Sequence, residues 1–342
     1  MKRLRHIVHF GAVTIASCLL SAGASATLVS YWPLDELNAG VTPDIVSGYD
    51  MNDVGPSSPT VVPGQIGNAF SFDSALMTML SRVHSAGDLL PINQHPSFTV
   101  SMWANVAGMG QNDDRLFSEG VTGDPTPLYN IGTQQGGLDG RLDLFTRPGA
   151  NHEFSTFEPF DGTWHHIAMV TDEGDFTLYV DGVQDATNFV GGDLMNLNTT
   201  SIGGIERGDL DTNRCCWVTG LIDDVSLWRS ALSEATIEQL AQGVTPSEIV
   251  GLGLPAGDVN GDMAVDTLDF EVIRDNFLRD GVLRSEGDLD LDGVVGLKDF
   301  KIWKNAAFPP GAASVPEPGT LGLAMAGMLL IQCSRRRRPR GL

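Results

Sequence analysis

Apolar and polar residues alternate along most of the chain between residues 27 and 248. The segment 97–106 repeats apolar side chains at every second position, which is the period of a half-buried β-strand. The segment 164–171 is partly apolar on both faces, as expected of a central strand in a two-sheet sandwich. The segment 175–180 alternates again and leads into Asp181-Gly182, the signal for a two-residue hairpin turn. This pattern of short strands predicts a mainly β fold, a sandwich or jelly roll.

Helical periodicity is confined to a few segments. Within the β-rich region, residues 233–241 are the convincing helical stretch. After a glycine-rich link, apolar residues recur at helical spacing in two segments 30 residues apart. The two apolar stripes are Phe270, Ile273 and Phe277, and then Phe300, Trp303 and Ala307. We therefore expect a small α-helical module after the β domain.

Each of these two helices follows an acidic loop, and the loops match one another position by position. Side-chain oxygens occupy loop positions 1, 3 and 5, position 7 offers a backbone carbonyl, and position 12 is a carboxylate. Carboxylates at alternate positions repel one another, and a hard dication that takes six to eight oxygens turns this repulsion into coordination. The alternative is a solvated acidic run. The repeat predicts two calcium ions, held by Asp258, Asn260, Asp262, Ala264, Asp266 and Asp269 in the first loop and by Asp288, Asp290, Asp292, Val294 and Asp299 in the second.

The two loops also differ in ways that predict unequal binding. Met263 stands at position 6 of the first loop, where a sharp turn favours glycine, so we expect this loop to bind more weakly than the second. At position 9 the first loop offers Asp266, whereas Gly296 leaves the second loop to use water. Val265 and Val295, at position 8, are expected to pair the loops through a short β contact.

The two ends of the chain have the composition of targeting segments. Residues 1–26 have a basic start, a short apolar run and an Ala-Ser-Ala exit, which predicts a secretory signal peptide. A lipoprotein cleavage box at Cys18 is the alternative. Residues 315–342 begin Val-Pro-Glu-Pro, run apolar and end in an arginine cluster, and they resemble a PEP-CTERM sorting signal. The resemblance implies an exosortase-type partner and export to the cell surface, while a plain membrane anchor is the alternative.

The net charge limits the classes of binding partner, and the cysteine content limits the possible disulfides. The chain has 342 residues and a net charge of −22, and both end segments are basic, so the body is more acidic still. Such a body repels nucleic acid and anionic lipid, which excludes nucleic-acid binding. Only Cys215 and Cys216 lie in the body, and adjacent cysteines are poor disulfide partners, so two half-buried thiols are expected, with a rare vicinal disulfide as the alternative.

Five segments of the β-rich region carry a family resemblance. They are LVSYWPLDE (28–36), PGQIGNAFSFD (63–73), WHHIAMVTDEGDFTLYVDGVQ (164–184), TSIGG (200–204) and GLIDDVSLWRSALSEATIEQL (220–240). Together they resemble the laminin-G-like, concanavalin A-like jelly-roll superfamily, which includes lectins, adhesion modules, pentraxins and glycoside hydrolases. The resemblance implies a jelly roll over residues 27–248. The resemblance also implies that a further calcium ion in this domain would be normal. Asp44 and Asp223 lie in the segments where family members often hold such an ion, and the sequence does not decide whether they bind one here.

Catalytic motifs are absent from the β-rich sequence. Retaining glycosidases on this fold carry two facing carboxylates about 5 Å apart, and the Glu-x-Asp run that supplies them is missing. His165 and His166 are adjacent on a strand, so their rings point to opposite faces and cannot grip one metal ion or substrate. The tryptophans are expected in the core, with Trp217 the best exception for sugar stacking.

The acidic repeat carries a second resemblance. A paired loop-helix repeat with GDVNGD and an aspartate at position 12 is similar to a type I dockerin, which implies a cohesin-like partner. The family's recognition positions fall on Thr267-Leu268 and Leu297-Lys298, and these pairs differ, which puts a symmetric binding mode in doubt. The expected order is signal peptide 1–26, jelly roll 27–248, linker 249–256, dockerin-like calcium-binding domain 257–308, linker 309–314 and sorting tail 315–342.

We expect an exported, non-catalytic surface protein whose jelly roll binds a polysaccharide or a surface glycoprotein. Two alternatives stay open: a secreted polysaccharide-active hydrolase, and a structural adhesion or matrix protein. The missing carboxylate motif favours the first interpretation over the hydrolase.

Overall fold

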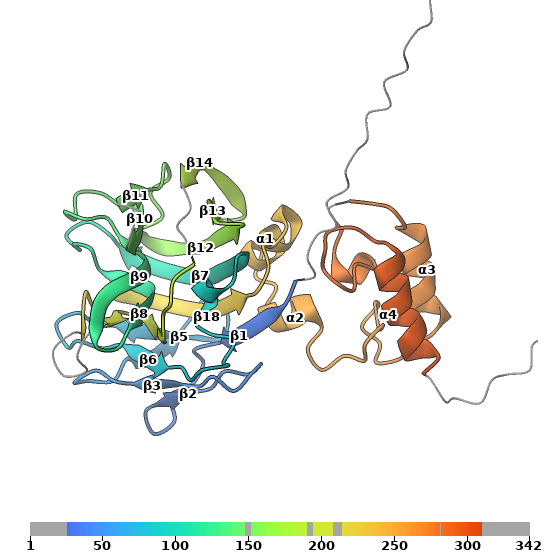
Figure 1. The fold of residues 1–342 in the computed structure, drawn as a ribbon, viewed down its shortest axis with the longest axis horizontal. Helices are drawn as coiled ribbons and strands as arrows, with labels where there is room; N and C mark the ends of the chain where they lie inside the picture. The colour runs from blue at the N-terminus through green and yellow to red at the C-terminus, as the bar shows by residue number, and fades with distance from the viewer. Residues whose placement is uncertain (1–25, 148–151, 190–193, 208–213, 281, 310–342) are drawn as a thin grey trace, which may run out of the picture.

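A computed structural model describes residues 26–147, 152–189, 194–207, 214–280 and 282–309. The predicted sorting tail, and the predicted signal peptide up to residue 25, lie outside the described residues. Figure 1 shows a β-sandwich joined through two short helices to a small helical module near the carboxyl end. None of the helices in the described part of the chain has the length and apolar character needed to span a bilayer.

The first sheet of the sandwich is antiparallel and has the order β14-β13-β12-β7-β18-β5-β4, with β1 paired to β18 beside this path. Its strands are β1 (Leu28–Trp32), β4 (Thr60–Pro63), β5 (Asn68–Phe72), β7 (Phe98–Ala107), β12 (Asp161–Asp172), β13 (Asp175–Val180), β14 (Val183–Phe189) and β18 (Gly220–Trp228). The predicted central strand is β12, which pairs with β7 on one side and β13 on the other. Asp181 and Gly182 form the predicted hairpin turn, both with positive φ.

The second sheet packs face to face with the first and has the order β11-β10-β9-β8-β15-β6-β3-β2. Its strands are β2 (Val41–Thr42), β3 (Met51–Asp53), β6 (Leu80–Val83), β8 (Arg115–Val121), β9 (Asp124–Thr133), β10 (Leu142–Arg147), β11 (His152–Phe154) and β15 (Thr199–Ile202). A short ribbon of β16 (Ile205–Glu206) and β17 (Arg214–Cys215) lies beside β8. A 3-10 turn, Ile92–Gln94, precedes β7. The mainly β sandwich is therefore confirmed.

Alternation along the strands builds the core between the two sheets. The predicted inward face of β7 is buried as expected, and alternate residues of β12 and β13 join it in one apolar cluster. The opposite face of β12 is also buried, because helices α1 (Glu234–Ala241) and α2 (Pro246–Val250) cover it. The α1 helix begins at its N-cap Ser233, whose side chain accepts the N–H of Thr236, so the predicted helix is confirmed.

The carboxyl-terminal module consists of two loop-helix units and a 3-10 turn, Arg284–Glu286. Helices α3 (Thr267–Asp275) and α4 (Leu297–Ala307) pack together through rings of Phe270, Phe300 and Trp303. Two predictions for this module were wrong. Phe277 does not extend the α3 stripe, because the helix ends at Asp275 and Phe277 is exposed.

The second correction concerns the contact between the loops. Val295 does not pair with Val265: its carbonyl accepts the N–H of Leu278, and its N–H bonds to the carbonyl of Arg279. An isolated antiparallel bridge joins Asp280 to Val294 in the same place. The second loop therefore pairs with residues 278–280, which follow α3 and are closer to it in the sequence than the first loop is.

The module also touches the sandwich. The side chain of Leu291, in the second acidic loop, packs against the apolar cluster between the first sheet and helices α1 and α2. The N–H of Ala26 donates to the carbonyl of Asp290 over 3.1 Å. The second loop is thus both part of the module and its contact with the jelly roll.

Candidate functional sites

The second acidic loop brings three carboxylates together. One oxygen each of Asp288, Asp290 and Asp292 lie within 4.8 Å of one another. Asp288 and Asp290 are buried, and one oxygen of Asp290 is shut away from water with no hydrogen-bond partner. An unpaired oxygen of this kind is costly to bury, and a hard cation such as Ca²⁺ would take it as a ligand. The donor set fits a divalent cation.

Negative charge accumulates in this second loop. Burial raises the pKa of Asp288 to about 7, and the charges of Asp299, Asp290 and Asp292 add to the shift. Burial likewise raises the pKa of Asp290. Lys298 neutralises part of this charge: its Nζ lies 2.8 Å from Asp292 and 3.4 Å from Asp290. A dication would remove this repulsion.

The first loop repeats the same backbone pattern. The carboxylate of Asp258 accepts the N–H groups of Gly261 and Met263 over 2.8 and 2.9 Å, as Asp288 accepts those of Asp292 and Gly293. Asn260 donates from its side-chain amide to Asp262 over 3.0 Å. The side chains at positions 1, 3 and 5 therefore converge here too, although Asn260 and Asp262 are exposed.

The remaining predicted ligands lie around the loop-helix junctions. The N–H of Ala264 donates to Asp262, and that of Val294 donates to Asp292. Position 12 is buried in both units: Asp269 and Asp299 each accept three backbone N–H groups, two from their own loop and one from the helix N-cap. These carboxylates bind each loop to the first turn of its helix.

Asp266, the predicted ligand at position 9 of the first loop, serves as the N-cap of helix α3 in this structure. Its carboxylate accepts the N–H of Leu268 over 2.7 Å and caps α3, and its carbonyl accepts the indole N–H of Trp303 over 2.8 Å. A ring from α4 thus holds the end of the first loop. The two units are connected at this residue.

Each loop holds one side chain in the left-handed conformation. Position 4 is Gly261 in the first loop and Leu291 in the second, and position 6 is Met263 in the first and Gly293 in the second. All four have positive φ, and Met263 and Leu291 have φ of 70° and 55°. The sequence drew attention to Met263 alone, because only position 6 has a fixed glycine in the expected loop.

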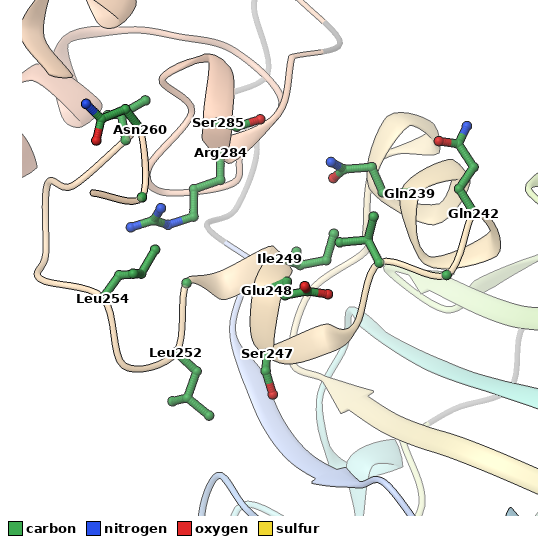
Figure 2. A pocket seen from close by; sticks show the side chains of 15 residues that line it. Gln239, Gln242, Ser247, Glu248, Ile249, Leu252, Leu254, Asn260, Arg284 and Ser285 are labelled. Atoms are coloured by element: carbon green, nitrogen blue, oxygen red, sulfur yellow. The ribbon is translucent and has the colours of Figure 1, made fainter. Parts of the chain in front are cut away.

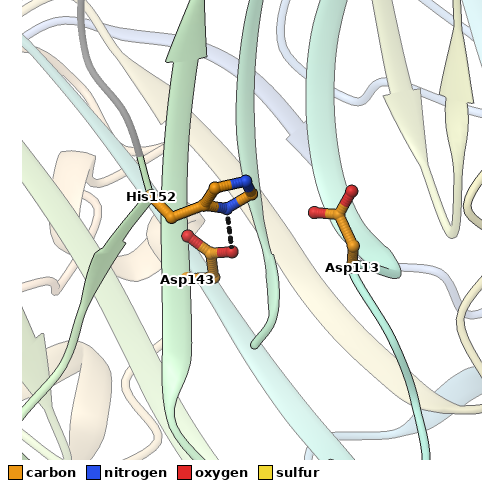
Figure 3. Close-up of side chains that lie close together, drawn as sticks. All are labelled: Asp113, Asp143 and His152. Carbon is orange, nitrogen blue, oxygen red and sulfur yellow. Dashed lines mark hydrogen bonds and ion pairs between the residues drawn. The ribbon is translucent and has the colours of Figure 1, made fainter. Parts of the chain in front are cut away.

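A second cluster of ligand-type side chains lies on the outer face of the second sheet. Asp113, Asp143 and His152 each offer an atom within 4.8 Å of the others (Figure 3). His152 Nδ1 is 2.5 Å from Asp143, and Asp113 pairs with the guanidinium of Arg115. Asp143 is fully buried, and burial raises its pKa to about 6. Asp143 is paired with the ring of His152 and Asp113 with the guanidinium of Arg115, so we interpret the cluster as a structural network of paired side chains.

The carboxylates of Asp113 and Asp143 are about as close together as the catalytic pair of a retaining glycosidase. They differ from such a pair in their exposure to solvent. A general acid must reach the glycosidic oxygen, and Asp143 has no exposed surface. The sequence could not indicate this cluster, because its members lie on the loop before β8, on β10 and on β11. No short motif joins such residues.

The two aspartates that the sequence associated with a jelly-roll calcium ion have different environments. Asp44 is buried and accepts bonds from Ser30 and from four backbone N–H groups, so it orders its own loop. Asp223 and its neighbour Asp224 are buried, and each keeps one oxygen without a partner. Burial raises the pKa of Asp224 to about 8 and that of Asp223 to about 7.

The adjacent histidines point to opposite faces, as predicted. His166 is buried, hydrogen-bonds Ser101 over 2.9 Å and lies edge-on to Trp103, and burial lowers its pKa to about 4. The ring of His165 lies on the other face between two carboxylates, 2.7 Å from Asp181 and 3.3 Å from Asp161. His166 is therefore part of the framework of the sheet.

The prediction that the tryptophans lie in the core is confirmed for three of them. Trp32 and Trp228 are completely buried and Trp103 nearly so. Trp217, the expected exception, is half-buried beside Gly204, and its indole N–H is shut away from water without a partner. It is therefore not an open stacking platform.

The cysteine pair lies close to the structural network of paired side chains on the second sheet. Cys215 and Cys216 are free and half-buried, and both pack against Phe145. A hydrogen bond from Cys216 and the nearby Arg207 lower the pKa of the Cys215 thiol to about 6. Cys215 is part of the ribbon of β16 and β17 and Cys216 follows it, so this ribbon sets the positions of both thiols.

A cavity of about 580 Å³ lies between helices α1 and α2 and the carboxyl-terminal module (Figure 2). Arg284 extends into it from the 3-10 turn and reaches the C-cap Gly251, and Asn260 of the first loop lines the same wall. The charges of Asp258 and Asp269 act on Arg284 and raise its pKa, although burial is the larger effect and lowers it. The arginine is therefore an internal counter-charge for the first loop.

Residues 82–238 match the family described as the Concanavalin A-like lectin/glucanases superfamily. Residues 314–338 match the PEP-CTERM protein-sorting motif. A search of curated protein sequences finds no match.

Several solved structures are similar to the chain. Domain 4 of AbnA, a GH43 extracellular arabinanase from Geobacillus stearothermophilus, is 19% identical with a TM-score of 0.48, over 64% of this chain and 100% of that one. Trypanosoma rangeli sialidase is 14% identical with a TM-score of 0.46, over 63% of this chain and 32% of that one. The binding domain of Paraclostridial Mosquitocidal Protein 1 is 18% identical with a TM-score of 0.44, over 64% and 52%. By the two family matches, residues 82–238 form a concanavalin A-like domain of the laminin-G type, and the chain carries a PEP-CTERM sorting motif.

Proposed function

We propose that this protein is an exported, non-catalytic calcium-binding protein of the cell surface. Its jelly roll binds a polysaccharide or the glycan of a surface glycoprotein, and its carboxyl-terminal module is a dockerin-like unit that docks a partner when calcium is bound. The sorting motif supports export and processing by an exosortase-type system.

One observation carries the calcium part of the proposal. Three carboxylates of the second loop meet within 4.8 Å, and a buried oxygen of Asp290 has no donor. A dication would supply the missing partner for that oxygen and neutralise the charge that raises the pKa of Asp288. Asp299, from the first turn of α4, would complete the set. The first loop offers the same backbone frame with one carboxylate fewer at positions 1, 3, 5 and 12, because Asn260 is neutral.

The docking part rests on apolar side chains at the starts of the two helices. Leu268, on α3, and Leu297, on α4, are 53% and 75% exposed. A small module has few apolar side chains for its core, so leaving two leucines exposed is notable. Exposed leucines at the metal-binding ends of both helices suit a protein partner of the cohesin type. Lys298 and Thr267 flank them and differ between the units, so we propose one binding orientation.

The jelly roll supplies the glycan part. Its family includes lectins and glucanases, which makes a carbohydrate ligand the first choice, although the fold alone does not decide it. The free buried oxygens of Asp223 and Asp224 further support a third calcium ion in this domain.

Calcium titration of the full chain by calorimetry tests the proposal. We expect two or three ions per wild-type chain and the loss of one in Asp288→Asn, which keeps the shape of the side chain and removes a charged ligand. Asp275→Asn, an exposed acid on α3, is the matched control and should bind as the wild type does. A wild-type chain that binds no calcium at millimolar concentration would overturn the proposal, and hydrolysis of a polysaccharide would overturn its non-catalytic part.

A further inference from the structure

A second cavity, of about 440 Å³, lies at the edge of the first sheet. Phe157, Val180 and Val183 provide its apolar surface, and Asp181, Gln184 and Asp185 provide its polar groups. An apolar floor with a few polar groups is the usual composition of a ligand pocket, and the volume lies in the usual range of about 300–1,000 Å³. None of the calcium-site residues lines it.

Two of the apolar side chains are unusually exposed. Phe157 and Val183 are 48% and 70% accessible, on neighbouring walls of the cavity. The aromatic ring is not held by a mobile turn: the N–H groups of Thr156 and Phe157 donate to the buried carboxylate of Asp185 over 2.9 to 3.1 Å. The backbone that carries the exposed ring of Phe157 is therefore ordered before a ligand binds, which lowers the entropy cost of binding.

The polar side of the cavity is also ordered before any ligand arrives. Asp181 accepts the N–H of His166 over 2.9 Å and contacts the ring of His165 over 2.7 Å. The ring of His165 in turn lies edge-on to Phe157, with 5.7 Å between ring centroids. Gln184, on β14, also lines the cavity. The carboxylate of Asp181 is thus held in place by its bonds to β12 beside the aromatic ring.

The geometry points to this cavity as the glycan-binding site of the jelly roll, with an uncharged sugar as its ligand. A pyranose has an apolar C–H face and a polar edge of hydroxyl groups. The C–H face would lie on Phe157, and the hydroxyls would bond to Asp181 and Gln184. Two carboxylates line the cavity, Asp181 and Asp185, and their negative charge opposes the binding of uronic acids and other anionic sugars. This inference rests on the proposed glycan binding and adds a location and a substrate class to it.

The test uses the full chain and a panel of hexasaccharides built from glucose, mannose, xylose or arabinose, with hexagalacturonate as the anionic probe. We expect the wild type to bind at least one neutral hexasaccharide and not hexagalacturonate. Phe157→Ala should weaken the neutral ligand by about tenfold, and Val183→Ser should weaken it less. Leu138→Ala is the matched control, since Leu138 is an exposed apolar residue of another jelly-roll loop and should have no effect. Asp181→Asn should make hexagalacturonate binding measurable.

The outcomes separate the two claims. A wild type that binds none of these sugars overturns the proposed glycan function. A wild type that binds a neutral sugar with unchanged affinity in Phe157→Ala and Val183→Ser overturns the location beside Phe157 and leaves the glycan function standing. Equal binding of hexagalacturonate and a neutral sugar by the wild type overturns the substrate class. Because Phe157 and Val183 are largely exposed, both variants should retain the wild-type melting temperature.

Discussion

Substitution of Met263 by glycine should stabilise the carboxyl-terminal module. Met263 has φ of 70°, a conformation that costs an L-residue roughly 1–2 kcal/mol and costs glycine almost nothing. Glycine loses roughly 0.5–1 kcal/mol more conformational entropy on folding, which offsets part of this gain. The methionine is 63% exposed, so little packing is lost with it. The net effect is a gain of about 0.5–1 kcal/mol.

The same substitution at Leu291 should give no such gain. Leu291 has φ of 55° and stores a similar strain, but its half-buried side chain packs on the cluster between the first sheet and helices α1 and α2. Half of the roughly 1.5–3 kcal/mol for burying a leucine is about 1 kcal/mol, which cancels the relief of strain. We therefore expect Leu291→Gly to leave stability unchanged or lower it, and to loosen the contact with the sandwich.

Hydrogen exchange of the full chain, followed by mass spectrometry, measures both effects in the peptides that cover residues 257–308. A gain of about 1 kcal/mol corresponds to exchange about fivefold slower in Met263→Gly. Met263→Ala is the control, because it removes the side chain and keeps the Cβ that causes the strain; it should exchange as the wild type does. If Met263→Gly and Met263→Ala behave alike, or if Leu291→Gly gains as much as Met263→Gly, the reasoning from backbone strain is wrong.

Three other changes have predictable signs. Arg284→Gln removes the counter-charge of the first loop, so calorimetric titration should show calcium binding there up to about fivefold tighter; weaker binding would contradict this role. In chelator, the melting temperature of the jelly roll should fall as pH rises toward 8, because folded Asp224, whose pKa is raised to about 8, keeps a proton that the unfolded chain releases from about pH 4 upward. Asp224→Asn should flatten that profile, and a flat wild-type profile would exclude the effect. His152→Ala leaves the buried carboxylate of Asp143 without its partner and should cost about 1–3 kcal/mol in urea unfolding, with a loss below about 0.5 kcal/mol as the contrary result.

The sandwich could be predicted from the sequence because its signal is local. Alternate residues of β7, β12 and β13 had to face one core, and they do. The turn at Asp181-Gly182 and the helix that begins after Ser233 follow from backbone preferences of single residues. The strand order could not be obtained in this way: the pairing of β18 with both β7 and β5 depends on contacts between distant segments.

The candidate sites divide along the same line. The acidic loops could be found from sequence because each contains its own ligand positions within a dozen residues. The cluster of Asp113, Asp143 and His152, and the cavity beside Phe157, come from separate strands and loops and have no linear signature. Even within the module, Phe277 and Val265 were placed wrongly, since the end of α3 and the partner of Val295 are decided by tertiary packing.

The contact at Leu291 links the two parts of the molecule in a way that neither alone would suggest. In a metal loop, position 4 is a turn position with no ligand to provide, so glycine would serve it at lower cost, as Gly261 does in the first loop. The second loop instead contains a leucine with a strained backbone, and in return the chain gains a hydrophobic contact between Leu291 and the jelly roll. Any ion that fixes the second loop therefore also fixes the position of Leu291 against the sandwich. The proposed calcium binding would then be coupled to the orientation of the module, so the full chain and not an isolated fragment is the molecule to measure.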